Sequence, residues 1–463
     1  MEKILFVVPI NRTYVIMPHL GLGYLASVAR ESGYHADILN CLKERMDYRG
    51  FERYILENPA DIFAITMMTY DINPTRKHIE IIRKHYPSSQ IVLGGAHPSG
   101  DFLGILHDFP EADFAFRGEA ELGFREFLEV NRAEGRQGDF GGVANLVWRN
   151  PEGKIVVNGW RVIHDLDDIS FPAWDLMDPR EYPEAPHGGF ARNYPVAPII
   201  ITRGCPFKCT FCSGKSVTGT LVRKRSIANV MEELRYLAED FGVREVHVED
   251  ENFTLHRKLV MEFCRALTES GLKFTWACPS GIRLDNLDAE MLDAMQESGC
   301  HSLAVGIEFG SDRIHALTKK GLTVDLIREK LALLSRYDIK VTGFFMMGIP
   351  GETRDEMLMT MRLARQLPIH RAQFNNFMPL PGTEIYDDLR EQGKLDGLPT
   401  DHFFVHDVSY VPEGMTRKQL KNMQRRAYLR FYLRPRVAFQ ILKDIESPRQ
   451  LYYLAKRFMD AMD

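Results

Sequence analysis

Three cysteines stand close together in the segment Arg203–Ser213. Cys205, Cys209 and Cys212 have the spacing C-x-x-x-C-x-x-C and directly follow the apolar run Pro198–Thr202. A [4Fe–4S] cluster is normally held by four cysteine thiolates. Three thiolates on one short loop therefore predict a cluster with three protein-bound irons and a fourth iron open to another ligand.

The other cysteines lack ligand spacing. They are scattered at Cys41, Cys264, Cys278 and Cys300. In a reducing compartment clustered cysteines indicate metal binding or catalysis rather than disulfides, and isolated thiols are commonly small buried hydrophobes. Cys278 is kept as a candidate catalytic residue, because it ends an expected strand and could point into an active site.

Composition bounds the class of protein. The chain has 463 residues, enough for two or three domains, and a net charge of only −5, which gives no general argument for nucleic-acid or membrane binding. The apolar run near the N-terminus is too short for a signal peptide, and no stretch approaches the roughly 20 apolar residues of a membrane span. We expect a cytoplasmic globular protein without a transmembrane segment or a nucleic-acid partner.

Residues 1–135 alternate expected strands and helices, which predicts a Rossmann-like, doubly wound parallel sheet. The strands are expected at Ile4–Val8, His35–Leu39, Asp61–Ile65, Gln90–Gly94 and Ala112–Phe116, and helices at Leu20–Ser32 and Pro74–Tyr86. Ligands of such sheets bind outside the carboxyl ends of the strands. Those ends carry Pro9–Asn11, Thr66–Tyr70, Gly94–Pro98 and Arg117–Glu119.

The alternation of expected strands and helices is interrupted over residues 136–194. A hairpin is expected from Ala144–Trp148 and Ile155–Asn158, followed by a loop-rich stretch with several prolines. We interpret this region as a connector between domains.

A second alternating series occupies residues 195–395 and predicts a partial (β/α)6 barrel, whose active face is at the strand C-termini. Its strands are expected to start near Ile199, Glu245, Phe274, Ser302, Lys340 and Gln373. Asp285 or Asn286 is expected to cap the helix that ends at Gly299, and Gly299 to form its left-handed C-cap.

The C-terminal region, residues 396–463, is expected to be helical. Between Thr416 and Arg436 it carries eight Lys or Arg and no acidic residue, interleaved with apolar side chains. This pattern favours a solvated basic face over an apolar stripe, with contact to phosphate, anionic lipid or an acidic partner as the alternative.

Taken together, the motifs resemble the radical S-adenosylmethionine (radical SAM) superfamily, in the branch with an N-terminal cobalamin-binding domain. Beside the cysteine loop, the runs that carry the resemblance are Gly94–Pro98, Arg117–Glu119, Asp167–Trp174, Glu249–Thr254, Gly306–Ser311, Gly348–Glu352, Pro379–Thr383 and Phe431–Pro435. The resemblance implies that SAM chelates the open iron and that one electron cleaves it to methionine and a 5′-deoxyadenosyl radical. Phe207 and Phe211 would shield the cluster from water.

The resemblance also implies roles for residues around SAM. By family position, Asp250 and Glu308 are candidates for the ammonium and ribose of SAM. Gly348 and Gly351 would let the backbone approach the adenosine. Arg283 could pair with the SAM carboxylate or form a surface ion pair.

The N-terminal domain departs from one cobalamin-binding pattern, Asp-x-His-x-x-Gly, whose histidine ligates cobalt. The corresponding position reads Asn11–Tyr14, which implies cobalamin without a histidine ligand. Cobalt would then face either Asn11–Tyr14 or the loop of Thr66, Met67, Met68 and Thr69. Gly94 and Gly95 would admit the nucleotide tail, and His97 is interpreted as a loop hydrogen-bonder rather than a ligand.

The function implied is methylation of an unactivated carbon, or a phosphinate phosphorus, of a small-molecule substrate. An external donor such as flavodoxin or ferredoxin would supply electrons. Three alternatives remain open: a cobalamin-dependent oxidative cyclase or rearrangement enzyme without methyl transfer, a radical SAM enzyme with a vestigial cobalamin domain, and a cobalamin-binding sensor or carrier with a structural cluster.

Overall fold

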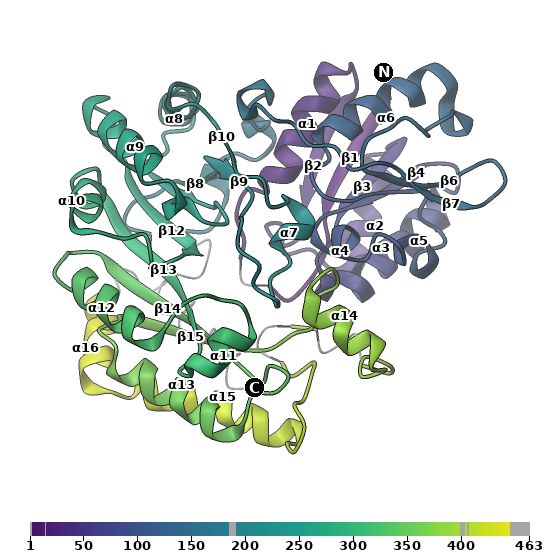
Figure 1. Ribbon diagram of the computed structural model, residues 1–463. Coiled ribbons are helices and arrows are strands. Elements are labelled where there is room, and N and C mark those ends of the chain that lie inside the picture. The colour runs from purple at the N-terminus through teal and green to yellow at the C-terminus, as the bar shows by residue number, and fades with distance from the viewer. Residues whose placement is uncertain (1, 14, 185–190, 399–402, 405–406, 445–463) are drawn as a thin grey trace. The chain divides into compact units, whose positions relative to one another are not determined.

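The chain forms two compact units (Figure 1). The computed structural model describes residues 2–13, 15–184, 191–398, 403–404 and 407–444. Tyr14 of the Asn11–Tyr14 candidate and residues 445–463 of the C-terminal region therefore lie outside the described residues. Unit 1 comprises Met1–Tyr182, Cys212–Lys224 and Leu380–Gln392, and unit 2 comprises Pro183–Phe211, Arg225–Pro379 and Gly393–Asp463.

Unit 1 contains a seven-stranded sheet in the order β2-β1-β3-β4-β5-β6-β7. Its parallel strands are β1 (Lys3–Val8), β2 (His35–Asn40), β3 (Ile62–Thr66), β4 (Gln90–Gly94) and β5 (Phe114–Phe116). The continuous apolar run of β1 is buried throughout its last five residues. Such runs are typical of parallel strands that are covered on both faces.

Helices cover both faces of this sheet, as the doubly wound prediction requires. Helices α1 (Leu20–Glu31) and α6 (Glu121–Glu134) pack with Ile4 and Phe6 of β1. Helices α2 (Tyr48–Glu57), α3 (Ile72–His85) and α5 (Ile105–Asp108) pack with the alternate residues Leu5 and Val7. The period of two along a strand thus divides the core into two layers.

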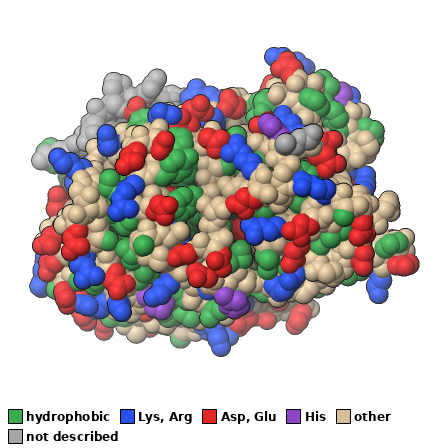
Figure 2. Space-filling model, turned by 90° about the horizontal axis from the view of Figure 1, so that it is seen from above, with side chains coloured by type: hydrophobic (Ala, Val, Ile, Leu, Met, Phe, Trp, Pro, Cys, Tyr) green, Lys and Arg blue, Asp and Glu red, His purple; other side chains and the backbone are tan. Residues whose placement is uncertain are grey.

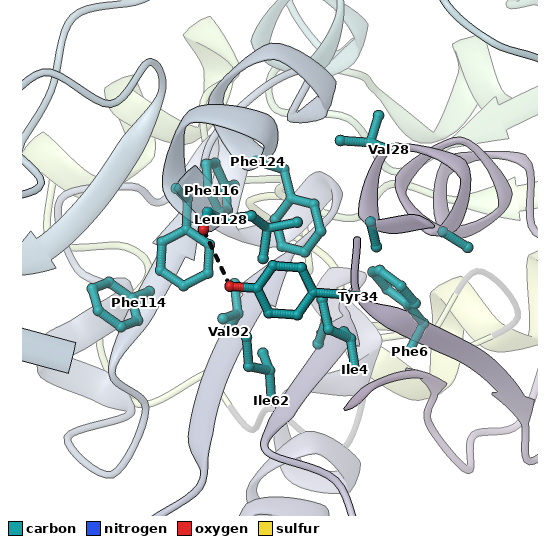
Figure 3. Close-up of a cluster of buried hydrophobic side chains, with 14 of the residues drawn as sticks. Ile4, Phe6, Val28, Tyr34, Ile62, Val92, Phe114, Phe116, Phe124 and Leu128 are labelled. Atoms are coloured by element: carbon teal, nitrogen blue, oxygen red, sulfur yellow. Dashed lines mark hydrogen bonds between the residues drawn. The ribbon is translucent and has the colours of Figure 1, made fainter. Parts of the chain in front are cut away.

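The first of these layers is rich in aromatic side chains (Figure 3). Phe116 and Phe124 meet edge to face with ring centroids 5.9 Å apart, a favoured aromatic geometry. The Tyr34 hydroxyl, buried in the same layer, donates to the Leu128 carbonyl oxygen at 3.1 Å. This buried hydroxyl therefore has a hydrogen-bond partner.

The expected hairpin forms, but it belongs to the sheet. Strands β6 (Leu146–Arg149) and β7 (Ile155–Val157) are antiparallel, and β6 pairs with β5 so that Phe114 lies opposite Trp148. Residues 146–157, assigned by sequence to a connector, extend the sheet of unit 1. Without them β5 would present an unpaired edge.

Unit 2 contains a six-stranded parallel sheet in the order β15-β14-β13-β12-β11-β8, the partial barrel that the sequence predicts. Its strands are β8 (Val196–Ile199), β11 (Glu245–Val248), β12 (Thr275–Ile282), β13 (Cys300–Glu308), β14 (Lys340–Met347) and β15 (Arg371–Asn376). The helices between them are α8 (Ile227–Asp240), α9 (Arg257–Glu269), α10 (Ala289–Glu297), α11 (Asp312–Leu317), α12 (Val324–Leu334) and α13 (Arg354–Gln366).

Short elements complete the two units. Unit 1 includes α4 (Ala96–Gly100), α7 (Gly214–Val217), β10 (Arg223–Lys224) and α14 (Glu384–Glu391), and unit 2 includes β9 (Thr202–Arg203).

The start of α10 corrects one expectation. The cap is Asp288, whose carboxylate accepts from the backbone N–H of Met291 at 2.8 Å. Asp285 does not cap the helix because its carboxylate binds the Arg283 guanidinium, with the closest contact at 2.8 Å. Gly299 has the expected left-handed conformation, with φ of +98°.

Helix α15 (Arg417–Tyr432) lies along β15, and α16 (Pro435–Asp444) follows it. The Tyr432 hydroxyl donates to the carbonyl oxygen of Ala372 at 2.8 Å and accepts from its N–H at 3.1 Å. The Tyr428 hydroxyl accepts from the Phe374 N–H at 3.2 Å, and the Gln424 amide donates to the Phe374 carbonyl at 2.8 Å. Side chains of α15 therefore satisfy the outer hydrogen-bonding groups of an edge strand.

The surface carries both signs of charge. On the face drawn in Figure 2, acidic and basic side chains are interspersed rather than separated into large areas of one sign. Among the described residues, no helix has the length and apolar character needed to cross a membrane.

Candidate functional site

The cysteine loop follows β9 at the C-terminal end of the first barrel strand. Cys205 and Cys209 are half-buried, Cys212 is exposed, and all seven cysteines are thiols rather than disulfides. Three thiols in one short loop suit a [4Fe–4S] cluster chemically. Within the described residues no three His, Cys, Asp or Glu side chains are arranged around a common metal position. The ligand role of the three cysteines therefore stays a prediction from their spacing.

Asp250 fixes the chain that enters this loop. Its carboxylate accepts from the N–H of Ile201 at 2.8 Å and from the N–H and hydroxyl of Thr202 at 2.9 and 2.7 Å. It is 3% exposed, and burial raises the pKa of Asp250 to about 7. The two carboxylate oxygens are thus used by neighbouring protein groups, which favours a positioning role over the expected contact with SAM.

Replacing Asp250 with asparagine is expected to loosen the loop, because an amide offers only one acceptor oxygen to these donors. We expect a loss of about 1–3 kcal/mol in unfolding free energy, measured by urea denaturation, and less iron per chain after reconstitution. Because the pKa of the Asp250 carboxyl is raised in the folded state, this group makes the unfolding free energy of wild type fall as pH rises from about 4 to 7. The asparagine variant has no such carboxyl, so its unfolding free energy should lack this contribution to the pH dependence. Asp240→Asn, an exposed change at the end of α8, is the control; equal effects from both would contradict the assignment.

Glu251 and Thr254, further along the loop after β11, add to this anchoring. The Glu251 carboxylate accepts from the Gly204 N–H at 3.2 Å, immediately before Cys205. The Thr254 hydroxyl donates to the Arg283 carbonyl oxygen at 3.2 Å. The Glu249–Thr254 motif therefore connects the start of the cysteine loop to the end of β12.

Arg283 holds the middle of the loop from another strand end. Its guanidinium lies 3.6 Å from the centroid of the Phe207 ring, pairs with Asp285, and donates to the Lys320 carbonyl oxygen at 2.7 Å. Arg283 therefore forms an ion pair, but its side chain is buried rather than on the surface, and contact with the SAM carboxylate stays a prediction. A cation over an aromatic face is stabilising, so Arg283 fixes Phe207 in place.

Glu308 and Lys320 form a buried ion pair beside the loop. The Lys320 ammonium lies 2.9 Å from Glu308 Oε1, and the side chains are 10% and 12% exposed. Burial lowers the pKa of Lys320, but the Glu308 carboxylate and the Cys209 sulfur outweigh this effect and raise it above its ordinary value. A positive charge therefore lies near Cys209, one of the three predicted cluster ligands.

The backbone at Glu308 is unusual. Its φ is +63°, a left-handed conformation that is costly for a residue with a side chain, and the register of β13 shifts here against β14. Gly306 admits the ion pair, because a Cβ there would lie 2.6 Å from Glu308 Oε1 and 2.8 Å from Lys320 Nζ. Such conformations are retained where the surroundings enforce them, often at functional sites.

The Gly348–Glu352 loop after β14 has the backbone freedom that the sequence implies. Gly348 and Gly351 have φ of +84° and +78°. The Glu352 carboxyl shapes the loop from within, since it accepts from the Gly348 N–H at 2.7 Å, and burial raises its pKa to about 8. Contact of these glycines with adenosine stays a prediction.

Cys278 lies within β12 rather than at its end, because the strand continues to Ile282. The side chain is 2% exposed, and burial raises the thiol pKa well above its ordinary value. A thiolate nucleophile is not favoured there. The expected position at a strand end is therefore wrong, and no contact with another described residue supports a catalytic role.

In unit 1 the two glycines after β4 have different surroundings, and only Gly94 faces open space. A Cβ on Gly94 would meet no atom within 4 Å, whereas Gly95 has φ of +104° and a Cβ there would lie 2.8 Å from the Met67 carbonyl oxygen. His97 is 4% exposed, its Nδ1 lies 3.3 Å from the Thr69 hydroxyl, and its Nε2 is buried with no hydrogen-bond partner among the described residues. Burial lowers the pKa of His97 to about 4, so the imidazole is neutral.

The loop Thr66–Thr69 is fixed by two residues that sequence reasoning missed. Asp71 is 2% exposed and its carboxylate accepts from the Met68 N–H at 2.8 Å and the Asn11 amide at 2.9 Å. His19 accepts from the Leu22 N–H through Nδ1, so in the neutral ring Nε2 carries the proton toward the Thr66 hydroxyl, 3.4 Å away. Asp71 thus ties Asn11 to the Thr66–Thr69 loop, the two candidate regions for cobalt.

No local motif marks these residues. Asp71 and Asn11 are 60 residues apart, and Thr66 and His19 are 47 apart. Only their positions after neighbouring parallel strands could have indicated that they meet.

The fold and the motifs together define a class of protein. It is an α/β radical enzyme in which a doubly wound, cofactor-binding domain precedes the partial barrel. The Radical SAM superfamily model matches residues 199–364, and the B12 binding domain model matches residues 7–128. The chain belongs to the radical SAM superfamily, in the branch of cobalamin-dependent enzymes that carry a B12-binding domain ahead of the radical SAM domain. The cofactors of this family are a [4Fe–4S] cluster, SAM and cobalamin.

Several named proteins are similar along most of the chain. An uncharacterised methyltransferase of Pyrococcus horikoshii is 30% identical over 92% of this chain and 90% of its own. Cytidylyl-2-hydroxyethylphosphonate methyltransferase of Streptomyces wedmorensis is 28% identical over 81% and 78%. The anaerobic magnesium-protoporphyrin IX monomethyl ester cyclase of Cereibacter sphaeroides is 25% identical over 90% and 67%.

A solved structure shares the fold. The radical S-adenosylmethionine methyltransferase TsrM from Kitasatospora setae aligns with a TM-score of 0.70 at 18% identity, covering 86% of this chain and 77% of TsrM. At this identity the likeness concerns the fold alone.

Proposed function

We propose that this protein is a methyltransferase that transfers a methyl group from SAM to an unactivated carbon, or a phosphinate phosphorus, of a small-molecule substrate. An external donor such as flavodoxin or ferredoxin supplies the electrons. The observation that carries the proposal is the cysteine loop packed on Arg283 and beside the buried Glu308–Lys320 pair. Relatives named as methyltransferases along most of the chain support the reaction class.

The overall reaction balances with two SAM molecules and two electrons for each methyl group transferred. One SAM gives the methyl group and leaves S-adenosylhomocysteine, while the other gives methionine and 5′-deoxyadenosine, which retains the hydrogen taken from the substrate. When bound, the cluster supplies the electron that cleaves SAM and cobalamin carries the methyl group.

The residues of the chain position these groups. Cys205, Cys209 and Cys212 would hold the cluster and leave one iron for SAM. Glu308 offers a carboxylate to the ammonium of SAM, and Lys320 beside it offers a positive charge to the SAM carboxylate. Because Asp250 is occupied by Ile201 and Thr202, we assign to it the placement of the loop rather than a SAM contact.

Cobalamin binding is proposed at the loops after β1, β3 and β4. The open space beside Gly94 leaves room for the nucleotide tail, Gly95 lets the Met67 backbone approach closely, and neutral His97 adds no cationic charge there. The Thr66–Thr69 loop or the Asn11 loop, which Asp71 ties together, would face cobalt. The open space beside Gly94 favours retained cobalamin over a vestigial domain.

A second candidate is oxidative ring formation with the same cofactors and no methyl transfer. The similarity to an anaerobic cyclase over 90% of the chain favours it as the alternative.

Product analysis distinguishes the two. The reconstituted full-length protein, incubated anaerobically with SAM, hydroxocobalamin, a reductant and candidate substrates, is expected to form S-adenosylhomocysteine and 5′-deoxyadenosine in equal amounts. As a control, omitting hydroxocobalamin should reduce the amount of S-adenosylhomocysteine formed by at least tenfold. Substrate-dependent 5′-deoxyadenosine without S-adenosylhomocysteine would overturn methylation and support the cyclase alternative.

A further inference from the structure

The segment that follows the cysteine motif is held by a buried ion pair. Residues Cys212–Lys224 belong to unit 1, whereas Cys205 and Cys209 belong to unit 2. Within unit 1, Arg223 Nη1 donates to Glu119 Oε2 at 2.7 Å and Nη2 donates to Oε1. The two side chains are 3% and 7% exposed, so the pair is both bidentate and desolvated.

Arg223 also organises its own segment. Its guanidinium donates to the Thr218 carbonyl oxygen at 3.1 Å and to the Ile163 carbonyl oxygen at 2.8 Å. The Ser216 hydroxyl, in α7, donates to the Gly382 carbonyl oxygen at 3.1 Å. The chain directly after Cys212 is therefore fastened at several points to unit 1.

Glu119 stands at the end of the Arg117–Glu119 motif, which is itself rigidly held. The Gly118 N–H donates to the Ser99 hydroxyl at 2.8 Å, and that hydroxyl donates to the Gly95 carbonyl oxygen at 2.6 Å. The Asn145 amide donates to the Glu119 carbonyl oxygen at 2.7 Å. Within unit 1, the Arg117–Glu119 motif thus connects Gly95 to the segment after Cys212.

We propose that Glu119 and Arg223 are positioning residues for the cluster ligand Cys212. This inference rests on the cluster assigned under the proposed function. The two planar groups of a bidentate arginine–carboxylate pair fix orientation as well as distance, and a buried pair that loses one partner leaves an unpaired charge. Loss of the pair frees the chain after Cys212 and weakens the hold of the third thiolate on iron.

The test measures cluster retention rather than turnover. Wild-type protein and Glu119→Gln are reconstituted with iron and sulfide, and iron release to a chelator is followed in the absence of SAM. We expect Glu119→Gln to release iron at least tenfold faster than wild type. Arg223→Lys keeps the positive charge but loses the bidentate guanidinium contact, so its rate of iron release should lie between those of wild type and Glu119→Gln. The reduced cluster in Glu119→Gln should also give a broadened electron paramagnetic resonance signal.

A matched control lies at the opposite end of β5. Asp113 is a largely buried carboxylate that accepts from Arg83 at 2.7 Å and from the Ile91 N–H at 2.8 Å. Asp113→Asn should lower thermal stability while leaving iron release within twofold of wild type. Unchanged release from Glu119→Gln, or equal acceleration in both variants, would overturn this inference alone. Wild-type protein that held no iron would overturn the cluster assignment and the inference with it.

Discussion

Replacing Cys209 with alanine is expected to abolish reductive cleavage of SAM while the fold is retained. The loop is anchored by Asp250, Arg283 and the backbone of Thr210, whose N–H donates to the Thr318 carbonyl oxygen at 3.0 Å, and none of these contacts needs the Cys209 thiol. A cluster left with two of its three thiolates has lost a ligand that cannot be replaced locally. We expect at least a 1000-fold drop in 5′-deoxyadenosine, an order-of-magnitude expectation for loss of the group that delivers the electron.

The matched variant for this experiment is Cys264→Ala. Cys264 is a buried thiol of α9 that is 1% exposed, so its truncation tests loss of packing without loss of a predicted ligand. It should keep its iron content and its SAM cleavage while unfolding at a lower temperature. Intact SAM cleavage in Cys209→Ala, or equal losses in both variants, would contradict the cluster assignment.

The second large effect is expected from Glu245→Gln. Glu245 begins β11 and is fully buried, and its carboxylate accepts five hydrogen bonds. The donors are the ring nitrogens of His247 and His301, the hydroxyl of Thr275, and the backbone N–H groups of Arg192 and Asn193. A glutamine removes the charge and turns an amide N–H₂ toward groups that donate. We expect a loss of about 3–5 kcal/mol in unfolding free energy at pH 7, measured by urea denaturation.

The pH dependence of this effect has a definite sign. Burial raises the pKa of Glu245, but the hydrogen bonds from His247 and His301 outweigh it and hold the pKa well below its ordinary value of 4.5. Stability from such a group is present above pH 4.5 and is lost as pH falls below that value. The difference between wild type and variant should therefore shrink in acid.

Glu52→Gln is the control for burial. Hydrogen bonds from Lys84 and His85 also lower the pKa of Glu52, to about 2, but they lie at the surface. Exposed ion pairs contribute little because water and salt screen them. An effect of Glu52→Gln as large as that of Glu245→Gln would contradict the role assigned to burial.

Local patterns were enough to predict much of the fold. Continuous apolar runs such as Ile4–Val8 and Gln90–Gly94 correspond to buried parallel strands within a residue. Helix α2 has no counterpart among the predicted helices, because Phe51 and Ile55 are its only buried side chains and the apolar period is too sparse to be visible. The hairpin was predicted, but its partner β5 is distant in sequence.

In the candidate site, as in the fold, local sequence features could be predicted and contacts between distant residues could not. The spacing of the cysteines is local and indicates its chemistry directly. What Asp250 binds could not be predicted, because its partners Ile201 and Thr202 lie 49 and 48 residues away. Arg283 was left with two interpretations; the structure shows its ion pair with the nearby Asp285, and contact with the SAM carboxylate stays a prediction.

The hydrogen bonds between α15 and β15 have a consequence for synthesis. Because β15 precedes α15 in the chain, Ala372 and Phe374 have their outer backbone groups open until Tyr428 and Tyr432 have been made. An open strand edge can recruit a strand from another nascent chain. This edge is therefore open to aggregation until α15 has been made, and any shortened version for recombinant production should retain Arg417–Tyr432.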